Sequence, residues 1–273
     1  MKIGLYGLHR GLNADPEVLA ERALRVEELG FESIWVGDHI ALPDDAPDAA
    51  SEHRLEALVA LAYLAAATTR VVLGVGVLVL PQRQPVLLAK QLTSLDHLSR
   101  GRLRVGVAVG YVEAELAAFG VSLDERAART EEYLAVARAL WRHDPSFAGR
   151  FAGYHHVSQH PAPVHDGGPP IVFGGHAPTA IERAARLGDG WFGWALSPGE
   201  AAAHVARLAE VRREHGRESE GFEVTVVPDD PHRPDLVAAY ADAGVDRIVL
   251  VATTTPDDRT EEAVELGASL LAG

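Results

Sequence analysis

One recurring pattern constrains the fold of this chain more than any other feature. A helical stretch ends at a glycine and an apolar run begins a few residues later, as in EELGFESIWV (27–36), ARLGDGWFGW (185–194) and ADAGVDRIVL (241–250). Gly30, Gly188 and Gly244 suit the left-handed conformation that closes a helix. The runs that follow are continuously apolar, which is typical of strands buried on both faces of a parallel sheet.

The same pattern along the whole chain predicts eight strands with helices between them. They lie near residues 2–7, 32–37, 70–79, 102–109, 170–174, 190–194, 222–227 and 246–251. Eight alternating units in 273 residues predict a closed (β/α)8 TIM barrel in one domain, 1–273. A doubly wound open sheet is the main alternative, but the first strand-to-helix turn lacks the G-x-G-x-x-G of dinucleotide-binding sheets.

Helix starts and one irregular segment complete the outline. Asp15-Pro16-Glu17 predicts an N-cap followed by a proline, and similar starts are Gln84-Pro85, Ser197-Pro198 and Thr255-Pro256-Asp257. Asp124 is expected to cap a helix over 124–141. Residues of about 142–169 show no helical period and many Gly, Pro and His, which indicates an insertion before the fifth strand, such as a lid or pocket wall.

Composition excludes several classes of function. The formal net charge of −14 makes nucleic acid and anionic membranes poor partners. The absence of cysteine excludes disulfides, thiolate metal sites and a cysteine nucleophile. The N-terminus lacks the apolar core of a signal peptide, and the longest apolar run, Val71 to Leu80, is too short to span a bilayer. We therefore expect a cytoplasmic protein.

The residues that directly follow the strands are the candidates for chemistry, since active sites of such barrels form at the carboxyl ends of the strands. Asp38 and His39 follow the second strand. A carboxylate beside an imidazole suits proton transfer or cofactor contact, because histidine titrates near neutral pH. The alternative is a purely structural role, in which Asp38 caps a helix and His39 binds a loop carbonyl.

Small residues gather in the third and fourth strands. Gly74 and Gly76 interrupt the third strand, which indicates either a bulge approached by a ligand or tight packing of neighbouring strands. Gly106, Ala108 and Gly110 alternate along the fourth, which leaves room for a flat ring or forms a small-residue core layer. The acids that follow, Glu113 and Glu115, are interpreted as solvated residues at a helix start.

The fifth strand ends in a candidate phosphate site. It runs into Gly174-Gly175, and a helix begins near Ala177-Pro178, so that backbone N–H groups are free to bind an anion, with His176 as a further donor. A plain tight turn is the alternative. Metal binding is not predicted, because the four histidines of the irregular segment lack a ligand spacing known for zinc; these are His155, His156, His160 and His165.

Four stretches carry a resemblance to a known family: GFESIWVGDHIALP (30–43), TTRVVLGVGVLVLPQRQPVLLAKQLTSLDHLSRGRLRVGVAVGY (68–111), FAGRFAGY (147–154) and GGPPIVFGGHAPTAIERAARLGDGW (167–191). The chain resembles the bacterial luciferase-like superfamily, in particular its short oxidoreductases that use the deazaflavin coenzyme F420. The resemblance implies a (β/α)8 barrel with a flavin or deazaflavin in its mouth, and a homodimer.

The resemblance also implies roles for individual residues. The ring is expected on a third-strand bulge formed by Gly74, Val75, Gly76 and Val77, with a non-prolyl cis peptide at Gly76–Val77, and beside Ala108, Gly110 and Tyr111. Asp38 is expected to contact the cofactor, and His39 to accept or donate the proton that accompanies hydride transfer. Gly174, Gly175, His176 and Ala177 are expected to bind the cofactor phosphate. Some dehydrogenases of the family carry a catalytic Glu where this chain has Tyr111.

We therefore expect an oxidoreductase that exchanges hydride between F420 and a small organic substrate. An FMN-dependent monooxygenase on the same fold and a flavin-binding protein without turnover are the alternatives. A third alternative, an unrelated phosphosugar isomerase or lyase, is disfavoured because the only lysines, Lys2 and Lys90, are not expected at the catalytic rim.

Overall fold

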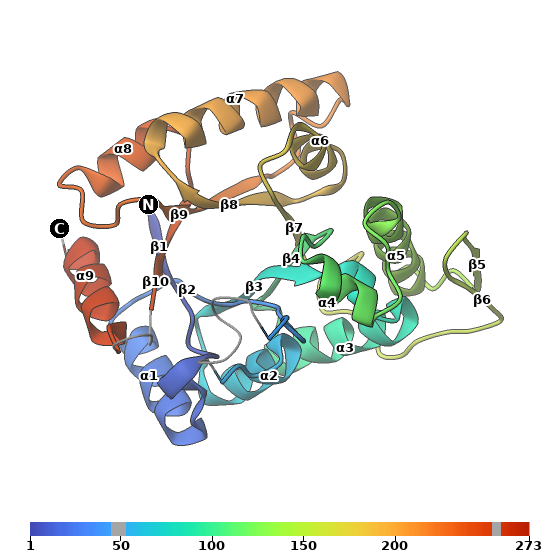
Figure 1. Cartoon of the computed structure of the whole chain (residues 1–273), viewed down its shortest axis with the longest axis horizontal. Helices are drawn as coiled ribbons and strands as arrows, with labels where there is room; N and C mark the ends of the chain where they lie inside the picture. The colour runs from blue at the N-terminus through green and yellow to red at the C-terminus, as the bar shows by residue number, and fades with distance from the viewer. Residues whose placement is uncertain (45–52, 253–257, 273) are drawn as a thin grey trace.

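The computed structural model describes residues 1–44, 53–252 and 258–272. Eight parallel strands close into a barrel in the order β1-β10-β9-β8-β7-β4-β3-β2 (Figure 1). Their bounds are β1 Lys2–Tyr6, β2 Ser33–Val36, β3 Val72–Val79, β4 Leu103–Ala108, β7 Ile171–Gly174, β8 Gly190–Leu196, β9 Glu223–Pro228 and β10 Arg247–Val251. All eight strands lie where the apolar runs predicted them, so the predicted barrel is confirmed and the open sheet is excluded.

Helices surround the barrel as the alternating pattern predicted (Figure 1). They are α1 Pro16–Glu28, α2 Ala57–Ala67, α3 Pro85–Leu98, α4 Glu113–Ala118, α5 Arg126–Trp141, α6 Pro178–Leu187, α7 Pro198–Glu214, α8 Leu236–Asp242 and α9 Thr260–Ala272, with short 3-10 turns η1 Gly11–Ala14 and η2 Leu80–Gln82. Within the described ranges, none of these helices combines the length and apolar character that crossing a membrane requires.

Several helix starts follow the local sequence signals. The Asp15 carboxylate accepts hydrogen bonds from the first turn of α1, Gln84 caps α3, and Ser197 forms a capping box with Glu200. Asp124 does not cap α5, whose N-cap position is Glu125 and carries no side-chain cap. The predicted start at Thr255-Pro256-Asp257 lies outside the described residues.

The glycines that close the repeated pattern do not all behave alike. Gly30 and Gly244 are left-handed, with φ of +91° and +80°. Gly188 is extended instead, with φ of −95°, so the prediction of a left-handed residue there was wrong. An added Cβ on Gly188 would lie 2.8 Å from the carbonyl oxygen of Ala184. Close contact with the preceding helix therefore accounts for glycine at this position.

The segment 142–169 is not fully irregular, because it contains a hairpin of β5 Ser146–Ala148 and β6 Gly153–His155. The Glu132 carboxylate of α5 accepts hydrogen bonds from the backbone of the hairpin loop, at 2.8 Å from Arg150 and 2.7 Å from Phe151. Figure 1 shows the hairpin beyond α5, away from the barrel strands. The expectation of a lid or pocket wall is therefore wrong for the hairpin, which α5 separates from the barrel.

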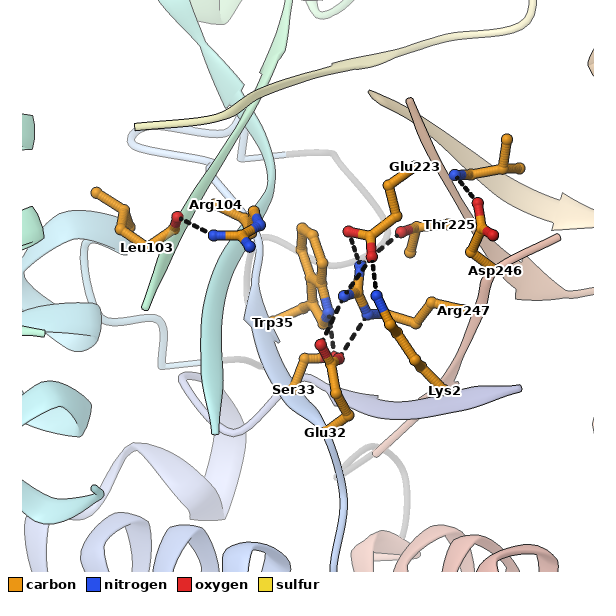
Figure 2. A network of polar contacts seen from close by, with 11 residues as sticks. Lys2, Glu32, Ser33, Trp35, Leu103, Arg104, Glu223, Thr225, Asp246 and Arg247 are labelled. Atoms are coloured by element: carbon orange, nitrogen blue, oxygen red, sulfur yellow. Dashed lines mark hydrogen bonds and ion pairs between the residues drawn. The ribbon is translucent and has the colours of Figure 1, made fainter. Parts of the chain in front are cut away.

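Side chains fill the barrel interior from the amino ends of the strands to the mouth at their carboxyl ends. Arg247 lies fully buried at the amino ends of the strands, and Trp35 covers it, with the guanidinium carbon 5.5 Å from the ring centre (Figure 2). Phe192 packs on Trp35 at 5.1 Å between ring centres. Tyr6, Val172 and Val249 belong to the same buried cluster. These side chains therefore fill the centre of the barrel between the amino ends of the strands and the mouth.

Candidate active site at the barrel mouth

Asp38 lies two residues after the end of β2, and its carboxylate connects two parts of the barrel mouth. Its two oxygens accept hydrogen bonds from the backbone N–H of Val79, at 2.9 Å, and from the Arg83 guanidinium, at 2.5 Å. Arg83 also pairs with Glu56 at 2.7 Å. Burial raises the pKa of Asp38, against the opposing effects of Arg83 and of the Val79 hydrogen bond. The carboxylate therefore ties β2 to the end of β3, a structural role different from the helix cap considered above.

His39 is held by Glu115, an acid that the sequence analysis interpreted as solvated. Its Nδ1 lies 3.0 Å from the carboxylate of Glu115, whose side chain is 2% exposed. The same carboxylate accepts backbone hydrogen bonds from Ile40 at 2.7 Å and Ala41 at 3.2 Å. Burial acts to raise the pKa of Glu115, but the bonds from His39 and the two amides lower it overall. An ionised, fully bonded Glu115 requires a proton on Nδ1 of His39, which leaves Nε2 for other partners.

The interpretation of Glu115 as a solvated acid was therefore wrong, whereas Glu113 is exposed as expected. Glu115 lies on the inner side of α4 next to Leu116, which is fully buried. The free side of His39 faces Tyr111, whose hydroxyl lies 3.4 Å from Nε2 and whose side chain is 78% exposed. Tyr111 thus contacts the side of the histidine ring that Glu115 leaves free.

The third strand carries the bulge that the glycines and the resemblance predicted. The pairing of β3 with β4 shifts register between Val75 and Leu78. The peptide bond Gly76–Val77 is cis, as the resemblance implied. Gly76 and Val77 are half-buried and, with half-buried Ala108 of β4, form the open part of the mouth on this side.

Other small residues near the bulge are explained by packing. An added Cβ on Gly74 would lie 2.2 Å from the Trp35 ring, and one on Gly106 would lie 2.0 Å from the carbonyl oxygen of Val75. Gly110 faces Val79 at 2.7 Å in the same way. Gly74, Val75 and Gly110 are all buried. An added Cβ on Gly76 would also lie 2.9 Å from the Phe192 ring. Protein atoms therefore fill the space expected at Gly106 and Gly110, and Gly76, Val77 and Ala108 are the residues here that keep half-buried surface at the mouth.

The turn after β7 is exposed and lies at the same end of the barrel. Gly175, with φ of +109°, His176 and Ala177 are exposed, whereas Gly174 is buried against Val77. Ala177 precedes α6 and offers no side-chain cap, unlike Asp15 or Ser197 at other helix starts. Pro178 has no N–H, and the N–H of Ala180 donates to the Ala177 carbonyl at 2.8 Å, so Thr179 provides the N–H of the first turn that can bind an anion.

His176 itself is oriented by the neighbouring strand. Its Nε2 accepts a hydrogen bond from the backbone N–H of Trp194 at 3.0 Å, and its ring stacks on His204 at 5.5 Å. Burial lowers the pKa of His176, and the charge of His204 acts in the same direction. The neutral ring thus presents Nδ1–H as its remaining donor.

Two aromatic residues and a third histidine, missed by the sequence analysis, complete the mouth. Tyr6 ends β1 and contacts Trp194 edge to face at 4.9 Å; Trp194 remains 41% exposed. His9 is 1% exposed, and its Nε2 accepts a hydrogen bond from the backbone N–H of Gly37 at 3.0 Å. Burial, with the charges of Arg10 and Arg54, lowers the pKa of His9 to about 3. The strand-end position of Tyr6 was the available sequence signal.

Comparison with known proteins agrees with this geometry. The family model described as luciferase-like monooxygenase matches residues 3–228. This chain belongs to the luciferase-like monooxygenase family. An uncharacterised protein of Mycobacterium tuberculosis is 33% identical over 241 residues, which cover 84% of this chain and 82% of that protein.

Relatives with named activities use either cofactor. An F420-dependent glucose-6-phosphate dehydrogenase of Kineococcus radiotolerans is 33% identical over 181 residues, 64% of this chain and 52% of that protein. An FMNH2-dependent dimethylsulfone monooxygenase of Pseudomonas fluorescens is 37% identical over 113 residues, 40% of this chain and 30% of that protein. The solved F420-dependent secondary alcohol dehydrogenase superposes with a TM-score of 0.80 at 20% identity, covering 98% of this chain and 97% of that one.

Proposed function

We propose that this luciferase-like protein is an oxidoreductase that transfers hydride between coenzyme F420 and a small organic substrate, with His39 handling the accompanying proton. The observation that carries the proposal is the pair of His39 and buried Glu115 at the barrel mouth, 3.0 Å apart. A carboxylate that holds one ring nitrogen fixes the tautomer, so that the other nitrogen can take or give a proton.

The residues at the mouth fit a flavin or deazaflavin. Gly76, Val77 and Ala108 form a half-buried, uncharged floor that a planar ring would cover, and exposed Trp194 stands at the same rim. The uncapped start of α6 would hold the phosphate through the N–H groups that follow Gly175. When bound, the cofactor supplies the hydride chemistry, and the protein supplies position and electrostatics.

The chain's own residues then have distinct tasks. His39 Nε2 exchanges the proton of the substrate, while Glu115 stabilises the imidazolium that forms when His39 is the acceptor. Tyr111, 3.4 Å from Nε2, bounds the proton-transfer site on its open side. Asp38 orients the loop that carries His39, since its carboxylate is occupied by Val79 and Arg83.

The relative that uses F420 supports the deazaflavin over FMN, because it aligns with a longer part of this chain than the FMNH2-dependent relative does. An FMN-dependent monooxygenase remains the second candidate on the strength of that relative. Titration of cofactor-free protein with F420 and with FMN, followed by absorbance and fluorescence, separates the two. Tighter binding of FMN, or binding of neither, contradicts the proposal.

A histidine variant tests the proton role. His39→Gln should leave cofactor affinity unchanged and slow hydride transfer by roughly 10²–10⁴-fold, the usual contribution of general acid–base catalysis. His97→Gln is the matched control, since His97 is exposed at the end of α3, at the opposite end of the barrel. Equal rates for both variants would remove His39 from the mechanism.

We also propose a homodimer formed through α2. This helix has the sequence ALVALAYLAAA, without a charged residue, yet Val59 is 66% and Tyr63 42% exposed. A helix that is apolar on all sides is normally buried on all sides. Light scattering should give twice the chain mass, and Val59→Glu should give the monomer; a monomeric wild type contradicts the proposal.

A further inference from the structure

Tyr111 stands between His39 and the open mouth. Its hydroxyl lies 3.4 Å from Nε2 of His39, and the two rings meet edge to face with their centres 5.9 Å apart. Tyr111 is 78% exposed, whereas the side chain of His39 is 21% exposed. Tyr111 is therefore the outer member of the pair, and a molecule in the mouth can reach it more easily than it can reach His39.

The direction of the hydrogen bond between them follows from Glu115. This buried carboxylate accepts the bond from Nδ1 of His39 at 3.0 Å, and the backbone N–H groups of Ile40 and Ala41 keep it ionised. Nε2 of the neutral ring can then only accept, so the Tyr111 hydroxyl is its donor. The phenolic oxygen still has lone pairs, and it has no second hydrogen bond among the contacts between described residues.

Tyr111 is also a neighbour of the aromatic residues of the mouth. Burial raises the pKa of Tyr6; the charges of Arg10 and Arg54 oppose that rise, and the charge of Tyr111 adds to it. An effect of this kind requires the two phenol groups to lie near each other. Tyr6 in turn contacts exposed Trp194, at 4.9 Å between ring centres. Tyr6 and Tyr111 therefore border the same space.

We propose that Tyr111 is a catalytic residue that carries the proton between the substrate and His39. This rests on the proposed oxidoreductase function and adds a second residue to its proton transfer. In the oxidative direction, the hydroxyl proton of an alcohol moves to the Tyr111 oxygen while the phenolic proton moves to Nε2 of His39. The same alcohol loses a hydride from carbon to the bound deazaflavin, so it becomes a carbonyl compound as the deazaflavin is reduced. The reverse transfers protonate a carbonyl oxygen.

The geometry favours this route over direct transfer to His39. Glu115, His39 and Tyr111 form one chain of hydrogen bonds from a buried carboxylate to the open mouth. When both protons move along the chain, Tyr111 is neutral before and after, and the positive charge stays on His39 beside Glu115. Direct transfer would require Tyr111 to leave Nε2 so that the substrate could take its place.

Nitrogen NMR of the histidine rings tests the contact in cofactor-free protein. Tyr111→Phe keeps the ring beside His39 and removes only the hydroxyl. It should therefore shift the signal of Nε2 and leave that of Nδ1, which Glu115 holds, in place. The His39→Gln spectrum identifies both signals. Tyr154→Phe is the matched control, because the Tyr154 hydroxyl donates to Asp144 in the hairpin beyond α5, and both signals should stay unchanged in it.

Kinetics with oxidised F420 and two probe alcohols, isopropanol and cyclohexanol, test the transfer itself. Tyr111→Phe should lower kcat by about tenfold or more, a smaller loss than that of His39→Gln, because water can partly replace the hydroxyl. Added to His39→Gln, the same change should cost little more, since both residues serve one transfer. Tyr154→Phe should retain the wild-type rate.

Three results would each overturn the inference: an unchanged Nε2 signal in Tyr111→Phe, a wild-type kcat in that variant, or losses that add fully in the double variant. Thermal unfolding checks that each variant is folded, as expected for a change at an exposed side chain. Cofactor-loaded wild type that turns over neither the alcohols nor the matching ketones also counts against it. Failure of F420 to bind, or a wild-type rate in His39→Gln, would instead contradict the proposed function.

Discussion

At the scale of single residues, the site shows which roles a sequence can reveal. His39 could be predicted because it follows a recognisable strand, and strand ends meet at one rim. Glu115 could not, because it lies 76 residues away and its burial depends on how α4 packs against the rim. An acid at a helix start has the same local sequence whether it is solvated or holds a histidine. Only the packing of α4 distinguishes Glu115 from exposed Glu113.

The pair Glu115 and Glu113 also gives a controlled prediction. Glu115→Gln should lower kcat by about tenfold or more, because an amide cannot stabilise the imidazolium that forms on His39. KM and cofactor affinity should change little, since Glu115 contacts His39 and backbone rather than the open floor. Steady-state kinetics with any substrate that the wild type turns over measures the split. Glu113→Gln should behave as wild type, and Glu115→Asp should recover part of the rate.

A fall in kcat/KM with kcat preserved would mean that Glu115 contributes only to the folding of the barrel mouth. Thermal unfolding of the same variants separates this from a catalytic effect, because a positioning role predicts lost turnover in protein that remains folded.

At the scale of elements, apolar runs and helix starts predicted strand positions well, since burial on both faces leaves a continuous signal. The strands β5 and β6 gave no such sequence signal, because a run of three residues is too short to show a period. Their hairpin also depends on a contact with Glu132 of α5, which is distant in the sequence. The glycines were only partly interpretable. Gly76 lies in a bulge and also makes room for the Phe192 ring, whereas Gly74 only makes room for the Trp35 ring, and the same residue type serves both cases.

Glu27 shows how one side chain connects two elements. Its side chain extends from α1 to the loop before β3. There its carboxylate accepts backbone hydrogen bonds from Thr69, Arg70 and Val71, at 2.9, 2.6 and 2.9 Å. Burial acts to raise the pKa of Glu27, but these bonds lower it to about 2. A carboxyl with a depressed pKa stabilises the fold above its ordinary pKa of 4.5 and loses that effect as pH falls toward 2.

Glu27→Gln should therefore lower the free energy of unfolding by about 2–3 kcal/mol at pH 7, the order expected when hydrogen bonds to a charged group are lost. The deficit should shrink at pH 3, where the wild type has already lost part of the advantage. Urea unfolding at both pH values measures it. Glu21→Gln, on the exposed side of the same helix, should cost little. A deficit that is equal at the two pH values would show that the charge of Glu27 is not the cause.

At the scale of the whole molecule, the barrel and the end of the barrel that carries the site could both be predicted, because parallel strands place all their carboxyl ends on one rim. The contents of the rim could not. The Asp38–Arg83 clamp, the His39–Glu115 pair and the backbone β-bridge between Arg10 and Arg54 each join residues from different loops. Which loops contact each other depends on the course of the backbone in three dimensions, and the local periodicity of the sequence does not predict that course.

The opposite end of the barrel shows how the chain closes on itself. Arg247 of β10 donates to Glu32, just before β2, at 2.7 and 2.8 Å, and to Glu223 of β9 at 2.8 and 3.1 Å (Figure 2). Lys2 of β1 also pairs with Glu223. The network therefore joins four neighbouring strands at the point where the first strand meets the last, β1 against β10.

Arg247→Met should lower the free energy of unfolding by about 3–5 kcal/mol, because it leaves two partly buried carboxylates without their shared cation. Arg104→Met is the matched control: Arg104 lies on the other side of Trp35 in Figure 2 and donates at 3.0 Å only to the carbonyl of Leu103 among the contacts described. That variant should cost less than about 1 kcal/mol. Both are measured by urea unfolding at pH 7. Cofactor affinity should be unchanged in each folded variant, since buried side chains fill the centre of the barrel between this end and the mouth. Equal losses of stability would mean that the network contributes no more than the packing of an arginine side chain, and that strand pairing alone closes the barrel.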